Sequence, residues 1–256
     1  MSIDILHLFP DELGINGDVG NAMALAERAR ARGIDATITK IGLNDELPEH
    51  ADAVVIGSGP LAAVQAVLPA LERMAPQLRR WRDRGVEFVA IGGGWDALGE
   101  GITLADGAVL NGAGVFPTRS IRGGKQRVGE TVVRMPEGLI VTGFSNHDSI
   151  MDGIDQATML GTVLKGHGNE ATKKSAEGYR RENLLASNLH GSLLTMNPRL
   201  ADDALYHAAE HARARGAIAN TIDLNLRTSW LDEMDGYAEA SRRALIARVG
   251  VKIEHS

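Results

Sequence analysis

Short apolar runs separated by glycine-rich turns predict alternating strands and helices in the first part of the chain. Residues 3–9 form an apolar, β-rich run that ends at Pro10, and residues 36–41 alternate like a second strand. Residues 53–57 and 87–91 are continuous apolar runs that end at or before a glycine, which is typical of buried parallel strands. We therefore expect four core strands here.

Helical periodicity fills the segments between and after these strands. Residues 22–31 follow Asn21, a residue type that commonly caps the N-terminus of a helix. Residues 61–84 are helical in pattern but contain Pro69 and Pro76, so we expect two helices or one kinked helix. Later helical patterns cover residues 198–215 and 234–248.

The chain changes in character after residue 107, where turns of glycine, proline and charged residues separate short strand-like runs. These runs are residues 108–116, 130–134, 139–143, 158–164 and 183–189. The whole pattern predicts an α/β fold with a doubly wound, mostly parallel sheet and appended antiparallel strands. We expect residues 1–215 to form this domain, and residues 216–256 to form a C-terminal helical extension that could face a partner.

The composition narrows the functional classes. A formal net charge of −6 gives no overall basic field, so nucleic acid is not an expected partner. No secretory leader and no run of about 20 apolar residues are evident, which predicts a cytoplasmic protein without a membrane span. The chain has no cysteine, which excludes disulfides, thiolate metal sites and cysteine catalysis. Only His207 and His211 share helical ligand spacing, and we expect no metal and no cofactor.

Three short segments are candidates for chemistry. They are Gly57-Ser58-Gly59 after one strand, Gly92-Gly93-Gly94 after another, and Asn188-Leu189-His190-Gly191 at the end of a late strand. Taken alone, each segment is typical of an ordinary turn at the end of a strand. Neither glycine segment fits a nucleotide-binding pattern. However, a strand, a sharp glycine turn and a helix also form a nucleophile elbow. Because ligands bind beyond the carboxyl ends of such strands, the loops after Phe9, Ile56 and Ile91 should line one crevice.

In combination, several segments resemble a known family. They are a Gly-Asp-x-Gly-Asn loop at residues 17–21, the two glycine turns, Gly-Phe-Ser-Asn-His at residues 143–147, and Leu-His-Gly at residues 189–191 followed by Asn197-Pro198. Over residues 3–212 the chain is similar to the cobyric-acid-synthase-like (CobB/CobQ-like) branch of class I glutamine amidotransferases, and within it to the GatD type. The resemblance implies a flavodoxin-like amidotransferase fold. It also implies a Mur-ligase-like partner, MurT, which amidates glutamate in the lipid II stem peptide.

The resemblance assigns roles to individual positions. In this family an elbow cysteine attacks the side-chain amide of glutamine, backbone N–H groups hold the oxyanion, and a histidine moves the proton to the leaving ammonia. Gly92 matches the cysteine and His190 the histidine. Arg127 matches an arginine that holds the substrate glutamine. The remaining positions expected to surround the substrate are Gly57, Ser58, Gly59 and Gly93.

The sequence departs from the family pattern around this site. Gly92 has no side chain, and no other cysteine can replace it. Trp95-Asp96 stands where the family has Tyr-Gln, and Gly57-Ser58-Gly59-Pro60-Leu61 stands where it has Gly-Gly-Gly-Gln-Asp. Ser58 lies on a different loop, so the sequence gives no reason to place its hydroxyl at the elbow. We therefore predict a degenerate amidotransferase without useful glutaminase activity.

Two alternatives remain open at this point. The chain could be a non-catalytic ligand-binding or regulatory protein on the same fold, with glutamine or a similar small molecule as its ligand. It could also be a hydrolase that combines His190 with another nucleophile, in which Asp96 would serve as a base. The absence of serine or threonine at the elbow disfavours the hydrolase.

Overall fold

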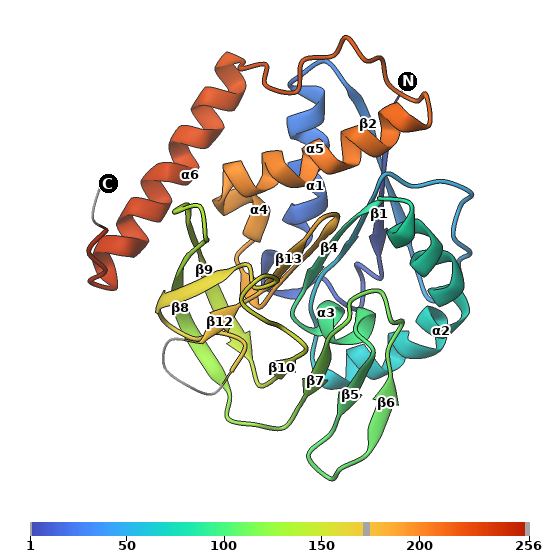
Figure 1. Cartoon of the computed structure of the whole chain (residues 1–256), viewed down its shortest axis with the longest axis vertical. Coiled ribbons are helices and arrows are strands. Elements are labelled where there is room, and N and C mark those ends of the chain that lie inside the picture. The colour runs from blue at the N-terminus through green and yellow to red at the C-terminus, as the bar shows by residue number, and fades with distance from the viewer. Residues whose placement is uncertain (1, 171–174, 254–256) are drawn as a thin grey trace.

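A computed structural model describes residues 2–170 and 175–253, and its centre is a six-stranded sheet in the order β13-β14-β4-β3-β1-β2 (Figure 1). All neighbouring pairs in this sheet are parallel except β13 with β14. The strands are β1 (Ser2–Leu8), β2 (Asp35–Ile41), β3 (Ala53–Ile56), β4 (Glu87–Ile91), β13 (Tyr179–Arg181) and β14 (Leu184–Ser187). The expected α/β class with a mostly parallel sheet is confirmed.

Helices cover both faces of this sheet because its strands are apolar on both sides. In β4, for example, Phe88 belongs to the core cluster that includes α2, whereas Val89 belongs to the cluster that includes α1 and α5. Side chains that alternate along a strand point to opposite faces, so each strand contributes to two cores. The helices are α1 (Gly20–Arg30), α2 (Leu61–Asp83), α3 (Gly93–Leu98), α4 (Leu193–Met196), α5 (Pro198–Ala214) and α6 (Ser229–Arg248), with a short 3-10 turn at Ile15–Gly17.

Two smaller sheets are attached to the core. One has the order β10-β7-β5-β6 and the other β12-β11-β8-β9-β15. The neighbouring pairs are antiparallel apart from β5 with β7. Their strands are β5 (Gly101–Thr103), β6 (Val109–Asn111), β7 (Arg119–Ile121), β8 (Arg127–Arg134), β9 (Ile140–His147), β10 (Ile150–Asp152), β11 (Gly161–Lys165), β12 (Ala176–Glu177) and β15 (Leu189–His190). Residues 108–116 were expected to form one strand, but only Val109–Asn111 is extended in a sheet.

The structure decides one helix prediction and corrects another. The segment after Pro60, expected to form two helices or one kinked helix, forms the single helix α2, which contains Pro69 and Pro76. Both prolines lie on its exposed face, where water can bond to the carbonyls that each proline leaves without a helical partner. Asn21 does not cap α1 but lies within it, because its amide is used elsewhere. Its oxygen accepts the Leu194 N–H at 2.9 Å and thereby ties α1 to α4.

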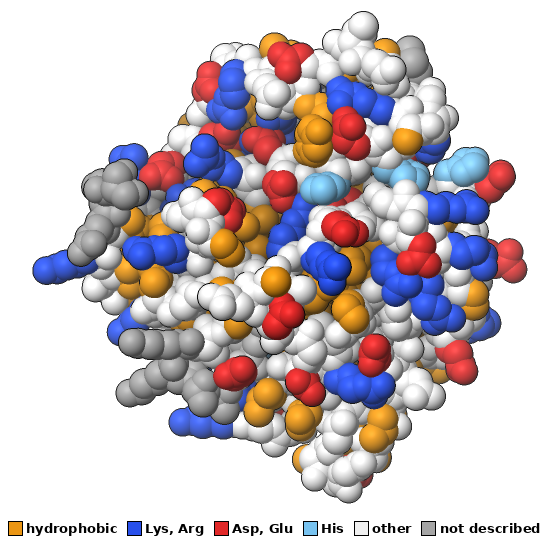
Figure 2. All heavy atoms as spheres, in the orientation of Figure 1, with side chains coloured by type: hydrophobic (Ala, Val, Ile, Leu, Met, Phe, Trp, Pro, Cys, Tyr) orange, Lys and Arg blue, Asp and Glu red, His pale blue; other side chains and the backbone are white. Residues whose placement is uncertain are grey.

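The C-terminal helix α6 folds back onto the rest of the chain (Figure 1). Leu231, Ala238 and Leu245 are its buried residues, and Asp235 is ion-paired with Arg28 of α1 at 2.6 Å. Residues 254–256 of the expected extension lie outside the described residues. Acidic and basic side chains are intermixed over the face shown in Figure 2. Among the helices of residues 2–170 and 175–253, none is long and apolar enough to cross a lipid bilayer.

Candidate active site

Gly92 forms the sharp turn between β4 and α3. Its backbone has φ of 50° and ψ of −116°, a region that favours glycine. Its N–H donates to the Ser187 carbonyl at 2.9 Å, which fixes the turn against the end of β14. A Cβ at this position would lie 3.1 Å from Cε1 of His190 and 2.6 Å from Oγ of Ser58. Any side chain at residue 92 would therefore project between these two groups.

His190 lies at the end of β15 and is fully buried together with Asp18. Its Nδ1 is 3.0 Å from Oδ2 and 3.2 Å from Oδ1 of Asp18. An ionised carboxylate only accepts hydrogen bonds, so Nδ1 carries the proton and Nε2 faces the site. Among the described residues Nε2 has no hydrogen-bond partner. Asp18 was not among the predicted site residues, although the Gly-Asp-x-Gly-Asn loop that contains it was part of the resemblance.

Ser58 lies at the elbow, where the sequence had given no reason to place its hydroxyl. Its Oγ accepts the backbone N–H of Gly93 at 3.0 Å, and its carbonyl accepts the N–H of Ile15 at 3.2 Å. The β3–α2 loop thus meets both the elbow and the loop after β1. As expected, the loops that follow Phe9, Ile56 and Ile91 converge at the carboxyl edge of the sheet.

The glycines of this region allow backbone segments to approach each other closely. A Cβ at Gly57 would lie 2.2 Å from the Leu13 carbonyl oxygen, and one at Gly59 would lie 2.8 Å from the Glu12 carbonyl oxygen. A Cβ at Gly93 would lie 2.7 Å from Cγ2 of Val64. Packing alone therefore requires glycine at these positions, and their contact with a substrate stays a prediction.

Arg127 begins β8 and is paired across the sheet with His147 of β9. Its Nη1 donates to the Ser149 carbonyl at 3.2 Å, and burial lowers its pKa. The charge of Asp148 opposes this lowering of the pKa, but Asp148 is ion-paired with Arg122, and within the described residues Arg127 itself forms no ion pair with a carboxylate. Burial, followed by the positive charge of Arg127 and a smaller effect of His190, lowers the pKa of His147 to about 4. The side chains of Arg127 and His190 thus lie close enough to His147 for their charges to act on it.

Asn188 is a further buried polar residue of this region; it belongs to one of the three candidate segments, but we assigned it no role. Neither atom of its side-chain amide has a hydrogen-bond partner in the described part of the chain. Its backbone N–H donates to Oε1 of Glu177 at 2.7 Å, and the preceding residue, Ser187, accepts the Gly92 N–H. Buried amides left unpaired are unfavourable, so Asn188, like His190 Nε2, has free capacity to bind a polar ligand.

Two other candidates are used elsewhere in the structure. The carboxylate of Asp96 is buried and paired with Arg122 at 2.6 Å, so it is engaged as a structural ion pair and not as a free base. His211 is paired with Asp52 at 2.9 Å, and His207 packs edge-on against Tyr206. Across residues 2–170 and 175–253, no group of three or more side chains is arranged to hold a metal ion.

Comparisons with known proteins identify the family. A profile of the CobB/CobQ-like glutamine amidotransferase domain matches residues 4–198. The GatD subunit of lipid II isoglutaminyl synthase (glutamine-hydrolyzing) from Staphylococcus aureus strain N315 is 29% identical over 209 residues, which is 81% of this chain and 85% of that protein. The corresponding subunit of Streptococcus pneumoniae strain R6 is 27% identical over 202 residues, with 78% and 77% covered.

Solved structures support the fold. A crystal structure of a glutamine amidotransferase superposes with a TM-score of 0.53 at 18% identity, covering 80% of this chain and 98% of the other. PurLQS from Thermotoga maritima superposes with a TM-score of 0.52 at 12% identity, covering 84% and 99%. With a family profile that spans most of its length, this chain belongs to the CobB/CobQ-like glutamine amidotransferases.

Proposed function

We propose that this chain is a GatD-like amidotransferase subunit that has lost glutamine hydrolysis and acts through binding. The observation that carries the proposal is the geometry of Gly92. The elbow turns in the manner that presents a side chain to His190, but glycine presents none. Because the chain has no cysteine, no thioester with glutamine can form.

The residues to which the resemblance assigns contacts with glutamine, Arg127 and His190, are retained, which supports a binding role. His190 is held by Asp18, and Arg127 is buried and has no ion-pair partner among the described residues, although the nearby charge of Asp148 acts on it. A buried guanidinium without such a partner suits the carboxylate of glutamine or of a similar small ligand. In this proposal Arg127 binds the ligand, and His190 and Asn188 bond to its polar groups.

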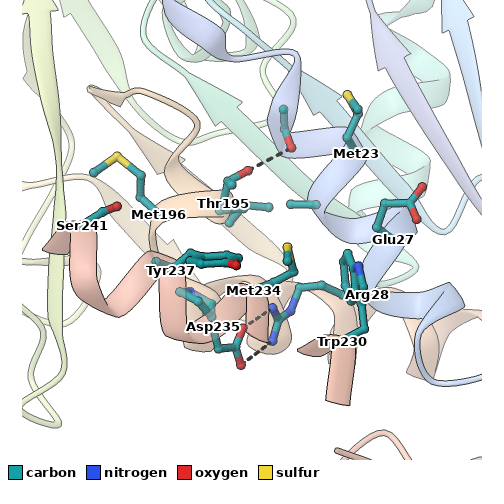
Figure 3. A pocket seen from close by; sticks show the side chains of 15 residues that line it. Met23, Glu27, Arg28, Thr195, Met196, Trp230, Met234, Asp235, Tyr237 and Ser241 are labelled. Atoms are coloured by element: carbon teal, nitrogen blue, oxygen red, sulfur yellow. Dashed lines mark hydrogen bonds and ion pairs between the residues drawn. The ribbon is translucent and has the colours of Figure 1, made fainter. Parts of the chain in front are cut away.

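The relatives support a two-subunit assembly, because both are named as subunits of a synthase. By this analogy the partner is a MurT-like Mur ligase that amidates lipid II. An apolar hollow of about 400 Å³ lies between α1, α4 and α6 and supports a partner that binds beside these helices (Figure 3). Met23, Trp230 and Tyr237 line it and are 55%, 40% and 61% exposed. Exposed apolar groups clustered around a hollow are typical of interaction sites.

A ligase with such a subunit would take its nitrogen from free ammonium and not from glutamine. The test is to co-express this chain with a Mur-ligase-like protein, isolate the complex by size-exclusion chromatography, and assay amidation with either nitrogen source. We expect a stable heterodimer that amidates with ammonium and does not respond to glutamine. Amidation with glutamine as efficient as with ammonium would disprove the loss of hydrolysis. A homodimer that never binds the ligase would instead favour the regulatory alternative.

A further inference from the structure

The hydroxyl of Ser58 takes up the space that a nucleophile at residue 92 would need. A Cβ at Gly92 would lie 2.6 Å from Oγ and 3.1 Å from Cβ of Ser58. A separation below 3.0 Å requires one of the atoms to move. Any side chain at residue 92 therefore requires the Ser58 hydroxyl to leave the position that it occupies in this conformation.

Ser58 also occupies the hydrogen-bond donor that acyl-transfer chemistry needs. In nucleophile elbows, the backbone N–H of the residue after the nucleophile contributes to the oxyanion hole. That residue is Gly93, and its N–H is already bonded to Oγ of Ser58 at 3.0 Å. An incoming carbonyl oxygen would have to displace the hydroxyl before it could accept this hydrogen bond.

The contacts of Ser58 do not make it a substitute nucleophile. A nucleophilic serine donates its hydrogen to a neighbouring base. Within the described residues, Nε2 of His190 accepts no hydrogen bond from Ser58 or from any other group. The serine is oriented toward the backbone amide instead. Ser58 and Asp18 are both buried in this conformation.

We infer that the Ser58 hydroxyl acts as a cap over the degenerate elbow. Glutamine hydrolysis is then prevented at two positions, by the missing thiol at Gly92 and by the hydroxyl of Ser58. This inference rests on the proposed loss of glutaminase activity. Restoring the thiol by Gly92→Cys would not be sufficient, because the new Cβ would meet the serine hydroxyl, which also occupies the oxyanion donor of Gly93. Replacing Ser58 and Gly92 together would make room for a cysteine side chain and would free the Gly93 N–H to bind a carbonyl oxygen.

The test compares three variants of the full chain: G92C, S58A/G92C and S58G/G92C. Alanine is the matched control, because it removes the hydroxyl but keeps the Cβ that would lie 3.1 Å from the new Cβ. Circular dichroism establishes that each variant is folded. The rates measured are ammonia release from glutamine and alkylation of the introduced thiol by iodoacetamide. We expect both rates to rise from G92C through S58A/G92C to S58G/G92C.

Freeing one oxyanion donor is expected to raise glutamine turnover by about 10²-fold between G92C and S58G/G92C. Other residues near the elbow could prevent all three variants from hydrolysing glutamine. In that case, the order of their alkylation rates tests the inference. Equal rates in folded variants would overturn the inference. Labelling of Ser58 in the unaltered protein by a fluorophosphonate would also overturn it, because the serine would then be a nucleophile. Glutamine turnover by the unaltered chain would instead contradict the proposed function, which is a separate result.

Discussion

Nδ1 of His190 lies 3.0 Å from Oδ2 of Asp18, and both side chains are completely buried. The pair joins the loop after β1 to the last strand of the five-stranded sheet, which are 172 residues apart in the chain. Such a pair orients an imidazole so that Nε2 points into the site, as in hydrolytic triads. Here the ring lies beside a glycine, because Cε1 of His190 is 3.1 Å from the position of a Cβ at residue 92.

We expect the Asp18–His190 pair to contribute to stability even without catalysis. Asp18→Ala would leave the buried Nδ1–H of His190 without an acceptor, which should lower the free energy of unfolding by about 2 kcal/mol. Asp18→Asn should lower it less, because the amide oxygen can still accept this hydrogen. Urea unfolding at neutral pH measures both values. Equal stability of the alanine variant and the unaltered protein would show that the pair contributes nothing.

Glu177 is expected to make stability depend on pH. Burial raises its pKa from 4.5 to about 7, although Asn188 and Ser187 donate hydrogen bonds to it. A carboxyl whose folded pKa is raised stabilises the fold most below the unfolded pKa of 4.5. This stabilisation is lost as the pH rises through about 7.

Glu177→Gln mimics the protonated acid and removes this dependence. Its free energy of unfolding should match that of the unaltered protein near pH 4.5 and exceed it near pH 8, by up to about 3 kcal/mol. Chemical unfolding at several pH values gives the difference curve. A difference that stays constant between these pH values would mean that the carboxyl is ionised in the folded protein throughout.

Arg28 is predicted to hold α6 on the domain. Its guanidinium is 2.7 Å from Asp202 of α5 and 2.6 Å from Asp235 of α6. Arg28→Ala should lower the free energy of unfolding by roughly 2 kcal/mol, since the partly exposed carboxylates keep some hydration. It should also speed amide hydrogen exchange along α6 more than elsewhere. Arg243→Ala, in an exposed pair with Glu239, is the control and should change stability by less than about 0.5 kcal/mol.

Asn197 is expected to fix the short helix that follows His190. Its side-chain amide donates to the carbonyls of Thr142 and Leu193, each at 2.8 Å, and accepts the Thr142 N–H at 2.9 Å. Asn197→Ala would leave these buried backbone groups unpaired and should lower the free energy of unfolding by about 3 kcal/mol. Thermal unfolding monitored by circular dichroism, with the exposed Asn220→Ala as control, checks this. A melting temperature equal to that of the control would refute the role.

Local sequence patterns were sufficient to predict the strands of the parallel core and the turn that forms the elbow. The apolar runs before Gly57 and Gly92 are strands in the structure, because strands buried on both faces need apolar residues at every position. The family resemblance, and not periodicity, led us to pair Gly92 with His190. Their roles in binding or catalysis still rest on that resemblance.

The missed features depend on contacts between distant segments. The sequence offered no reason to place the Ser58 hydroxyl at the elbow, because a loop pattern does not show which way its side chain points. Its position follows from the pairing of β3 with β4, which places the loop after β3 beside the turn after β4. Asn21 has the composition of a cap, yet its bond to the Leu194 N–H over 173 residues outweighs that local preference. A single sequence does not contain these distances.

Ammonia release from glutamine by the purified chain tests the central claim most directly. The assay uses saturating glutamine, with and without the ligase partner, and a cysteine-containing GatD as the positive control. Because residue 92 is glycine and carries no thiol, the chain should release no ammonia above the spontaneous rate in either case. Turnover near 1 s⁻¹, on the order of an ordinary enzyme, would contradict the account.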